Sequence, residues 1–422
     1  MNATCANDEK YQAEIAKAIK NLTSASDEEI DAAIAHIKER LPVMRDLNAI
    51  FSVSLVPDGK SIIIDAKNGE PKIVESTDEP LDTEMYMSPK TIDQLKNGLI
   101  DSRYAILRYA FFSIAFLPKG KIPVAIKFGD MLSPINPKYL KHFDSNDKSL
   151  PQPTTDLDQI KSDIKKWGFA YIKDAMSPEQ TKLLREAVLS QAAGEKNAGV
   201  GKFDGGPNAP NQRVWNLGNK GQEFIDLVDK NEWIPVLTNW FLGEDPTLFS
   251  FSANIARPGN IPMQLHTDQV SLQPPIRSIA FGLNFMWFLT DITEKNGGTR
   301  VYPASHIGEQ APDNPFDITG SIAASGPAGT CMVFESRLWH ATGPNTEPGS
   351  ERPVIITFFM RSYIRPQENA FLGIEPKVLA GLSDRVKTYF GYKVTGALGG
   401  VEQTKEGTFV SLPEHPVGRI RA

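Results

Sequence analysis

Cysteine is scarce in this chain of 422 residues, which contains only Cys5 and Cys331. Two cysteines so far apart cannot form the disulfide framework of a small secreted domain, and they favour a reducing compartment. The first residues, MNATCANDEKYQ, contain no apolar run that could serve as a signal peptide. We therefore expect a cytoplasmic protein.

Long apolar runs and an excess of positive charge are also missing. The longest apolar stretches, near residues 109–117 and 279–289, are too short to cross a bilayer. The 45 Lys and Arg residues are outnumbered by 51 Asp and Glu residues, for a net charge of −6. A general nucleic-acid binder would need a basic face. We therefore expect neither a membrane span nor a nucleic-acid partner, but an ordinary globular protein.

The first part of the chain reads as an α+β domain over residues 1–143. Two amphipathic helices are expected within residues 9–40, the second of which begins at the capping box Ser26–Glu29. A further helix begins after Ser88. The strand-like segments are 49–56, 61–66, 71–75, 111–117 and 122–128. The polar, proline-rich residues 144–156 are predicted to form a linker.

The second part, residues 157–422, has a different pattern. Residues 157–167 and the segment from Ser177 to about residue 193 read as helices, and residues 168–172 as a strand. From Leu248 onward, short strands alternate with Gly, Pro and Asn. Such spacing is typical of a β-sandwich or barrel of the jelly-roll kind.

The tripeptide His266-Thr267-Asp268 is a candidate metal site. Alternate residues of a strand point to the same side, so His266 and Asp268 could reach one ion. His340 lies 74 residues after His266 (340 − 266) and follows a strand-like segment. It could supply the third ligand. Two histidines and one carboxylate leave positions open for a co-substrate and O₂, as in non-haem Fe(II) oxygenases. Zinc accepts the same ligands.

The other four histidines are interpreted as structural or solvated. His36 sits in a charged helix and His142 near the linker, so both are expected in solvent. His415 lies in the C-terminal tail. His306 has no carboxylate at the matching spacing, and we interpret it as a structural loop residue.

Longer motifs surround these ligands. They are QRVWNL (212–217), FSANIARPG (251–259), QLHTDQ (264–269), LNFMWFLTDITEKNGGTRVYPASH (283–306) and WHATGPNTEPGSERP (339–353). Together they resemble the phytanoyl-CoA dioxygenase family of Fe(II)/2-oxoglutarate-dependent oxygenases over roughly residues 157–370. The resemblance implies a double-stranded β-helix, which is a distorted jelly roll with flanking helices. It also implies Fe(II), 2-oxoglutarate as co-substrate and O₂.

The resemblance assigns roles to particular residues. Arg352, twelve positions after His340, matches the arginine that binds the distal carboxylate of 2-oxoglutarate, for which a planar guanidinium is suited. Its rival, Arg361, is interpreted as a surface charge on a strand. The remaining matched positions are Gln264, Thr299 and Thr342 as co-substrate contacts, Trp287 as a pocket-wall aromatic, and Arg213 and Asn254 as pocket-lining residues. Plain core packing is the alternative for Trp287.

The N-terminal part resembles a second family. SIIIDAKNGEPKIVE (61–75), IDQLKNGLID (92–101) and SIAFLPKGKIPVAIKFGDML (113–132) are similar to the sterol carrier protein type-two domain. That resemblance implies an apolar tunnel for acyl chains or sterols. The alternative is an α+β domain that packs on the oxygenase or mediates dimerisation.

The resemblances together imply a dioxygenase that attacks an unactivated C–H bond of a small organic substrate, either lipid-like or a specialised metabolite. The outcome would be hydroxylation, or oxidative cyclisation or desaturation, of which kainoid-type ring closure is one example. Residues 196–211 and 269–277 are expected to form loops around the pocket. The alternatives are a lipid-binding or lipid-transfer protein with an inactive oxygenase fold, and a zinc hydrolase that uses the same three ligands.

Overall fold

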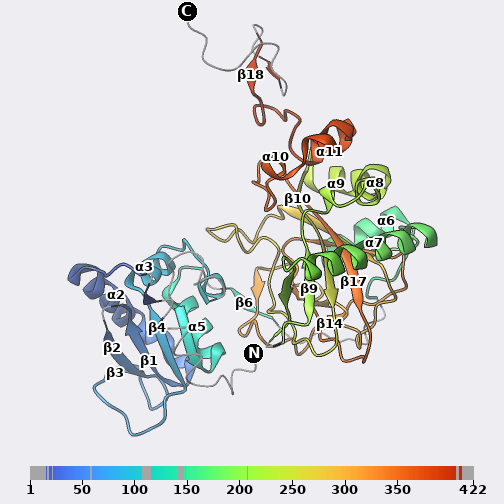
Figure 1. The fold of residues 1–422 in the computed structure, drawn as a ribbon. Coiled ribbons are helices and arrows are strands. Elements are labelled where there is room, and N and C mark those ends of the chain that lie inside the picture. The colour runs from blue at the N-terminus through green and yellow to red at the C-terminus, as the bar shows by residue number, and fades with distance from the viewer. Residues whose placement is uncertain are drawn as a thin grey trace, which may run out of the picture.

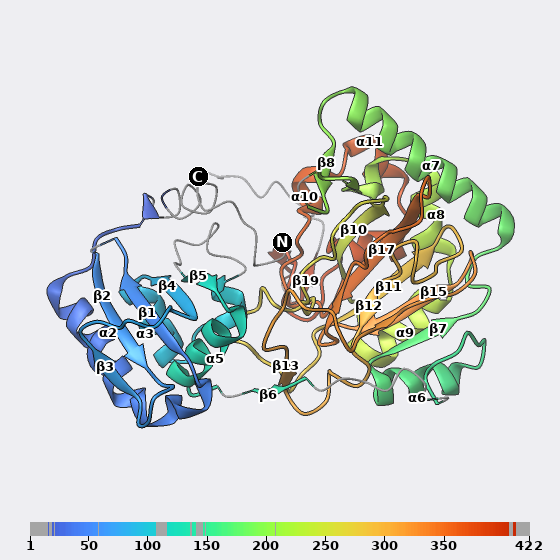
Figure 2. The same ribbon diagram turned by 90° about the horizontal axis from the view of Figure 1, so that it is seen from below.

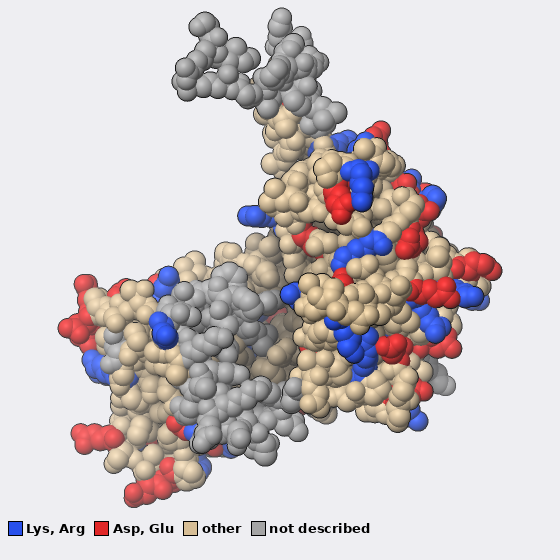
Figure 3. Space-filling model, in the orientation of Figure 1, with Lys and Arg blue, Asp and Glu red and all other residues tan. Residues whose placement is uncertain are grey.

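The computed structural model of the chain has two parts, drawn in blue and in green to red in Figure 1. It describes residues 22–57, 59–106, 116–135, 137–140, 147, 149–206, 208–404 and 408–410, together with 16, 19 and 20. None of the helices in this described part combines the length and the apolarity that crossing a bilayer requires. On the face drawn in Figure 3, acidic and basic side chains are intermixed over the C-terminal part.

The N-terminal part contains a five-stranded sheet with the order β3-β2-β1-β4-β5. The strands are β1 (Ile50–Leu55), β2 (Lys60–Asp65), β3 (Lys72–Val74), β4 (Thr83–Met87) and β5 (Phe116–Gly120). Only β1 and β4 pair in parallel. The helices are α2 (Asp27–Arg40), η1 (Leu41–Leu47), α3 (Pro89–Lys96) and α5 (Ile122–Leu132). They share one hydrophobic core with the sheet, so this part has its own α+β core.

Several sequence predictions for this part can be compared with the structure. The capping box is confirmed, since the Ser26 amide donates to Glu29 Oε2 (2.8 Å) and the Glu29 amide donates to Ser26 Oγ (3.2 Å). The predicted strand 122–128 is wrong, because these residues form α5. That helix is buried on most sides, so its apolar run carries no helical period to distinguish it from a strand. β4 was not predicted. Most of the predicted first helix and residues 111–115 lie outside the described residues.

The C-terminal part is built on a seven-stranded sheet with the order β7-β15-β11-β17-β10-β9-β8. A smaller sheet has the order β14-β12-β16. This sheet-rich core is consistent with the predicted jelly roll. The strands of the large sheet are β7 (Phe169–Ile172), β8 (Lys202–Asp204), β9 (Asn211–Val214), β10 (Thr247–Ala256), β11 (Gly282–Phe288), β15 (Cys331–Glu335) and β17 (Arg352–Met360). Those of the small sheet are β12 (Arg300–Val301), β14 (Ile322–Ala323) and β16 (His340–Ala341).

Helices cover one face of the large sheet and leave the other face for the site (Figure 2). They are α6 (Leu157–Trp167), α7 (Pro178–Asn197), α8 (Gln222–Lys230), α9 (Trp233–Leu242) and α12 (Asp384–Tyr389). Side chains of β10 and β11 such as Phe251 and Phe285 join these helices in the core. The shorter elements are η2 (Leu217–Asn219), α10 (Ala370–Gly373), α11 (Pro376–Gly381), β6 (Lys138–Tyr139), β13 (Gln310–Ala311), β18 (Glu402–Gln403) and β19 (Phe409–Val410).

The two parts contact each other directly. β6 pairs in parallel with β13. Farther along the interface, Lys127 Nζ lies 3.2 Å from Asp313 Oδ2. The end of the predicted linker is also fixed to the large sheet, since Thr154 pairs with Ile172. The division into residues 1–143, a linker at 144–156 and residues 157–422 stays a prediction.

Two of the remaining histidines are placed by the structure. His36 was expected in solvent, which is wrong. It is 8% exposed, and its Nε2 lies 2.8 Å from the carbonyl oxygen of Leu132, because α2 packs against the end of α5. His306 is the buried loop residue that was expected, with Nε2 3.0 Å from the Lys165 carbonyl oxygen. His142 and His415 lie outside the described residues.

Candidate active site

A cavity of about 490 Å³ lies on the face of the large sheet that the helices leave free. Its wall comes from alternate residues of three adjacent strands, because successive side chains of a strand point to opposite faces. These are Ser250, Ser252 and Asn254 of β10, Asn284 and Met286 of β11, and Arg352, Val354, Ile356 and Phe358 of β17. The loop that contains His266 and Asp268, together with His340 of the small sheet, completes the wall.

His266 and His340 lie opposite each other in an isolated antiparallel bridge. Each backbone amide donates to the carbonyl oxygen of the other residue at 3.0 Å. The two imidazole rings are thereby held with their centroids 4.3 Å apart. The two candidate ligands are therefore positioned by backbone hydrogen bonds.

Both rings are also oriented through their second nitrogen. His266 Nδ1 lies 2.9 Å from the Gln264 carbonyl oxygen, and His340 Nδ1 lies 2.9 Å from that of Leu338. A carbonyl oxygen can only accept, so each Nδ1 carries the proton. In the neutral imidazole, Nε2 is then left with its lone pair, which is the form that a metal ion requires.

Asp268 lies beside both free nitrogens. Its Oδ1 lies 3.5 Å from His340 Nε2 and 4.0 Å from His266 Nε2. Its Oδ2 accepts a hydrogen bond from Asn284 Nδ2 at 2.9 Å. One ligand atom from each of the three residues lies within 4.8 Å of the others, so in the described part of the chain this group could hold a metal ion.

Burial and mutual charge shape the protonation of the three side chains. Burial, together with the neighbouring His340, lowers the pKa of His266 to about 3. Burial also opposes charge on His340, but the Asp268 carboxylate outweighs it and raises the pKa of His340. Burial would raise the pKa of Asp268, yet His340, His266 and Asn284 together lower it. The group therefore presents an ionised carboxylate beside a neutral His266, as metal binding requires.

Arg352 is the second prominent feature of the cavity. It is only 1% exposed, and its Nε and one terminal nitrogen have no hydrogen-bond partner among the described residues. Burial and the nearby Arg213 lower the pKa of Arg352 to about 10. A buried guanidinium without an anion is costly, so the cavity is suited to a ligand that brings a carboxylate to Arg352.

Four other predicted residues line the same cavity. Thr299 Oγ1 lies 3.3 Å from the sulfur of Met286, and Thr342 Oγ1 accepts from Asn254 Nδ2 at 3.2 Å. Arg213 donates to Asp204 at 3.2 Å. Arg213 and Asn254 are thus placed in the wall, as their motifs suggested.

Two predicted residues are not brought into the cavity. Gln264 has an exposed side chain, and residues 261–265 form no strand, so alternation does not place it beside His266. The neighbouring Met263 lines the cavity instead. Trp287 is fully buried on the opposite face of β11, stacks on Phe285 and donates its indole N–H to Thr357 Oγ1 at 3.0 Å. Its role is core packing, because the next residue along from Met286 must point to the other face.

The interpretation of Arg361 as a surface charge was also incorrect. Arg361 is half-buried and donates to the carbonyl oxygens of Ala280 (3.1 Å) and Leu242 (2.8 Å). It ties the end of β17 to two neighbouring segments and does not line the cavity. This leaves Arg352 as the arginine of β17 that faces the site.

Asn284 is the most informative residue that sequence reasoning missed. It is 5% exposed, holds Asp268 through Nδ2, and its Oδ1 has no partner among the described residues. A polar residue at the even position of an otherwise apolar strand, LNFMWF, was the available signal. Ser250 and Ser252 follow the same alternation on β10. Of the two expected loops, the one at residues 269–277 contributes Val270 and Ser271 to the wall.

Comparison with known proteins shows a similarity to one family over the residues of this site. The phytanoyl-CoA dioxygenase (PhyH) model matches residues 164–354, which include all three candidate metal ligands and Arg352. "Dioxygenase af480" of Aspergillus fumigatus is 28% identical over 255 residues, which cover 58% of this chain and 82% of that protein. "Multifunctional dioxygenase ausE" of Penicillium brasilianum is 24% identical over 279 residues, covering 62% and 89%. These similarities support an oxidoreductase.

Among solved structures, the non-haem alpha-ketoglutarate-dependent carbocyclase SnoK from nogalamycin biosynthesis is similar, with 19% identity and a TM-score of 0.43. The match covers 54% of this chain and 94% of that chain. The N-terminal part lies outside the family match. Its resemblance to the sterol carrier protein type-two domain is not supported by these comparisons.

Proposed function

We propose that the protein is an Fe(II)- and 2-oxoglutarate-dependent dioxygenase that acts on an unactivated C–H bond of a small organic molecule. One observation carries the proposal. The same cavity contains a group of two histidines and one carboxylate and, separately, a buried arginine whose Nε and one terminal nitrogen have no protein acceptor among the described residues.

Arg352 distinguishes this proposal from a zinc hydrolase. The three ligands alone would suit zinc as well as iron. A hydrolase that uses them has no need of a second, buried cation, whereas a dicarboxylate co-substrate does. One end of 2-oxoglutarate would chelate the metal and the other would pair with Arg352 through parallel charge-assisted hydrogen bonds.

The residues present fit such a metal. His266, Asp268 and His340 would hold Fe(II), which with 2-oxoglutarate and O₂ supplies the oxidising power that a C–H bond requires. The protein's own contribution is orientation. The Gln264 and Leu338 carbonyl oxygens fix the two rings, and the Asn284 amide restrains the Asp268 carboxylate. Such outer contacts set ligand geometry and metal affinity.

Part of the cavity wall is apolar. Val354, Ile356 and Phe358 of β17 line the cavity, and Phe249 packs edge-on against Phe358 with ring centroids 5.1 Å apart. These side chains would exclude water from the reacting carbon. The volume of about 490 Å³ falls in the range of small-molecule sites.

Several reaction outcomes are compatible with this site. Hydroxylation and oxidative cyclisation or desaturation of a specialised metabolite all begin with removal of a hydrogen atom from carbon. Kainoid-type ring closure is one cyclisation of this class. The curated relatives are named as dioxygenases, one of them as multifunctional, which suits a scaffold that supports more than one outcome.

Anaerobic titration tests the proposal. The protein, loaded with Fe(II), should develop a visible metal-to-ligand absorption band on addition of 2-oxoglutarate, and His266→Ala should abolish it. Gln264→Ala, two residues away and exposed, is the matched control and should retain the band. Exposure of the complex to O₂ should release succinate and CO₂.

Other outcomes point to the alternative functions. Absence of the band from the wild type, with zinc present in the purified protein, would favour a hydrolase. Absence of the band with lipid retained through purification would favour a lipid carrier with an inactive oxygenase fold. Mass spectrometry of the native protein detects such lipid.

A further inference from the structure

The loop that follows Asp268 links the candidate metal site to the N-terminal part of the chain. Residues 269–279, here called the active-site loop, lie between Asp268 and β11 without forming a helix or strand. Val270 of this loop lines the cavity and also packs against the N-terminal hydrophobic core. The N-terminal part therefore directly supports one wall of the site.

Gln269, next to the candidate ligand, closes the active-site loop on itself. It is 7% exposed, and its amide donates to the carbonyl oxygens of Ile276 (2.5 Å) and Ile279 (3.2 Å). Its Oε1 accepts from Ser336 Oγ (2.8 Å) and from the Phe281 amide (3.3 Å). Because one side chain joins both ends of the loop, a movement near residue 277 is transmitted to the backbone beside Asp268.

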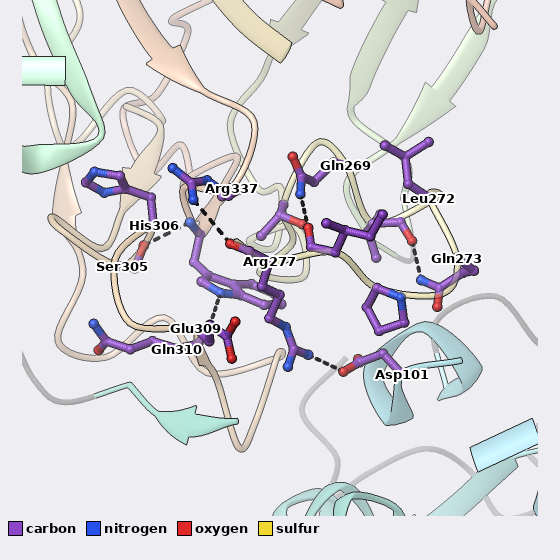
Figure 4. A pocket seen from close by; sticks show the side chains of 15 residues that line it. Asp101, Gln269, Leu272, Gln273, Arg277, Ser305, His306, Glu309, Gln310 and Arg337 are labelled. Carbon is purple, nitrogen blue, oxygen red and sulfur yellow. Dashed lines mark hydrogen bonds and ion pairs between the residues drawn. The ribbon is translucent and has the colours of Figure 1, made fainter. Parts of the chain in front are cut away.

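Arg277 fastens the far end of the loop to the N-terminal part. Figure 4 shows its guanidinium reaching Asp101, and the two groups form an ion pair. Its carbonyl oxygen accepts from an Arg337 terminal nitrogen at 3.2 Å. Arg277 is therefore held at its backbone by the C-terminal part and at its side chain by the N-terminal part.

Asp101 is itself held firmly. It is 8% exposed, and its Oδ1 accepts from the backbone amides of Arg103 (2.8 Å) and Tyr104 (3.3 Å). The Arg103 side chain is fully buried, binds Asp130 through two nitrogens (3.0 and 2.9 Å) and donates Nε to the Pro312 carbonyl oxygen at 2.6 Å. Two carboxylates and one guanidinium group of the N-terminal part thus meet the Arg277 guanidinium at the interface, which is the balanced arrangement that buried charges require.

We propose that Asp101 and Arg277 are positioning residues for the metal centre, through which the N-terminal part holds the active-site loop and, with it, Asp268. The role of Asp268 as a metal ligand rests on the proposed function, whereas the restraint that Asp101 and Arg277 place on the loop does not. The N-terminal part is in this way a structural component of the active site.

Removal of one interdomain ion pair at a time tests the proposal in the full-length protein. Arg277→Met breaks the pair on the active-site loop. Lys127→Met is the matched control, because the pair of Lys127 with Asp313 (3.2 Å) also joins the two parts but involves no residue of the loop. Asp101→Asn is the second variant, in case Arg277→Met does not fold, since an amide keeps the shape and the acceptor for the Arg103 amide.

The first measurement is hydrogen–deuterium exchange of the metal-free protein. We expect Arg277→Met and Asp101→Asn to raise exchange in residues 269–281 by about tenfold or more, and Lys127→Met to leave it unchanged. Equal exchange in all three variants and the wild type would overturn the proposal. This measurement does not depend on whether the protein is an oxygenase.

The second measurement is the affinity for Fe(II) in the presence of 2-oxoglutarate, under anaerobic conditions. Loss of a direct outer contact to a metal ligand weakens metal binding by about 10- to 100-fold. Arg277 acts on Asp268 only through the loop, so we expect the lower end of that range, about a tenfold rise in Kd, for Arg277→Met and none for Lys127→Met. A loop that exchanges faster while the Kd stays at the wild-type value would refute the positioning role. A wild type that binds neither Fe(II) nor 2-oxoglutarate would refute the proposed function, and the exchange measurement would still decide whether Asp101 restrains the loop.

Discussion

Replacement of Arg352 by methionine should have opposite effects on folding and on ligand binding. Burial, with some repulsion from Arg213, lowers the pKa of Arg352 to about 10. A base whose folded pKa is depressed destabilises the folded protein at neutral pH, here by roughly 3 kcal/mol. Methionine is flexible, similar in length and uncharged. The ligand-free Arg352→Met protein should therefore be at least as stable as the wild type.

The affinity for 2-oxoglutarate should change in the other direction. Truncation of one partner of a buried, hydrogen-bonded charge pair costs about 2–5 kcal/mol. Since 1.4 kcal/mol corresponds to a factor of ten, Kd should rise by roughly 30- to 4,000-fold. Anaerobic titration of the Fe(II)-loaded protein gives the Kd. Thermal unfolding with and without 2-oxoglutarate gives the stability, and only the wild type should gain from the ligand.

Arg361→Met is the matched control, because Arg361 binds backbone carbonyl oxygens outside the cavity. We expect it to lower the melting temperature without changing the Kd for 2-oxoglutarate. The reasoning would be refuted if Arg352→Met retained wild-type affinity, or if the ligand-free Arg352→Met protein lost several kcal/mol of stability, as a residue that merely braces the fold would.

Three further predictions concern Asn284, Trp287 and Glu368. Asn284→Leu removes the hydrogen bond to Asp268 (2.9 Å) and should weaken Fe(II) binding by about 10- to 100-fold in a metal titration, with unchanged affinity refuting its role. Trp287→Ala should lower the free energy of unfolding by about 3–5 kcal/mol, because this buried side chain packs in the core. Urea unfolding measures the loss, and a loss well under about 1 kcal/mol would contradict the core-packing role of Trp287. Burial raises the pKa of Glu368 to about 7, so the folded state favours the neutral acid and stability should fall by roughly 3 kcal/mol as pH rises from about 4.5 to 7. Glu368→Gln should abolish that fall, which urea unfolding at several pH values measures. A fall of the same size in the variant would mean that another group is responsible.

The candidate metal ligands and Arg352 could be predicted from the sequence because they occupy recognisable positions within sequence motifs. His266, Asp268 and His340 are recognisable by residue type and spacing, and the structure brings them within 4.8 Å of one another. Arg352 is likewise found by its distance along the chain from His340. These predictions need only the order of the residues and the resemblance to a family, and they do not depend on the packing of neighbouring segments.

Other residues could not be predicted because their position depends on which face of an element is covered. Trp287 and Met286 are adjacent on one strand, and only the helices packed against the sheet decide that Met286 faces the cavity. Gln264 was placed by strand alternation, but its segment forms no strand. The apolar residues 122–128 suited either a strand or a helix, since α5 is buried on most of its sides.

The sequence alone thus determined the candidate metal ligands, the candidate co-substrate arginine and the change from an α+β pattern to a β-rich pattern. The tertiary structure alone showed that Nε and one terminal nitrogen of Arg352 have no hydrogen-bond partner among the described residues and that Asn284 holds Asp268. It also showed that Asp101 reaches Arg277, 176 residues later in the chain. No local pattern encodes such a pair, because contacts between distant segments arise only when both parts have folded and packed together.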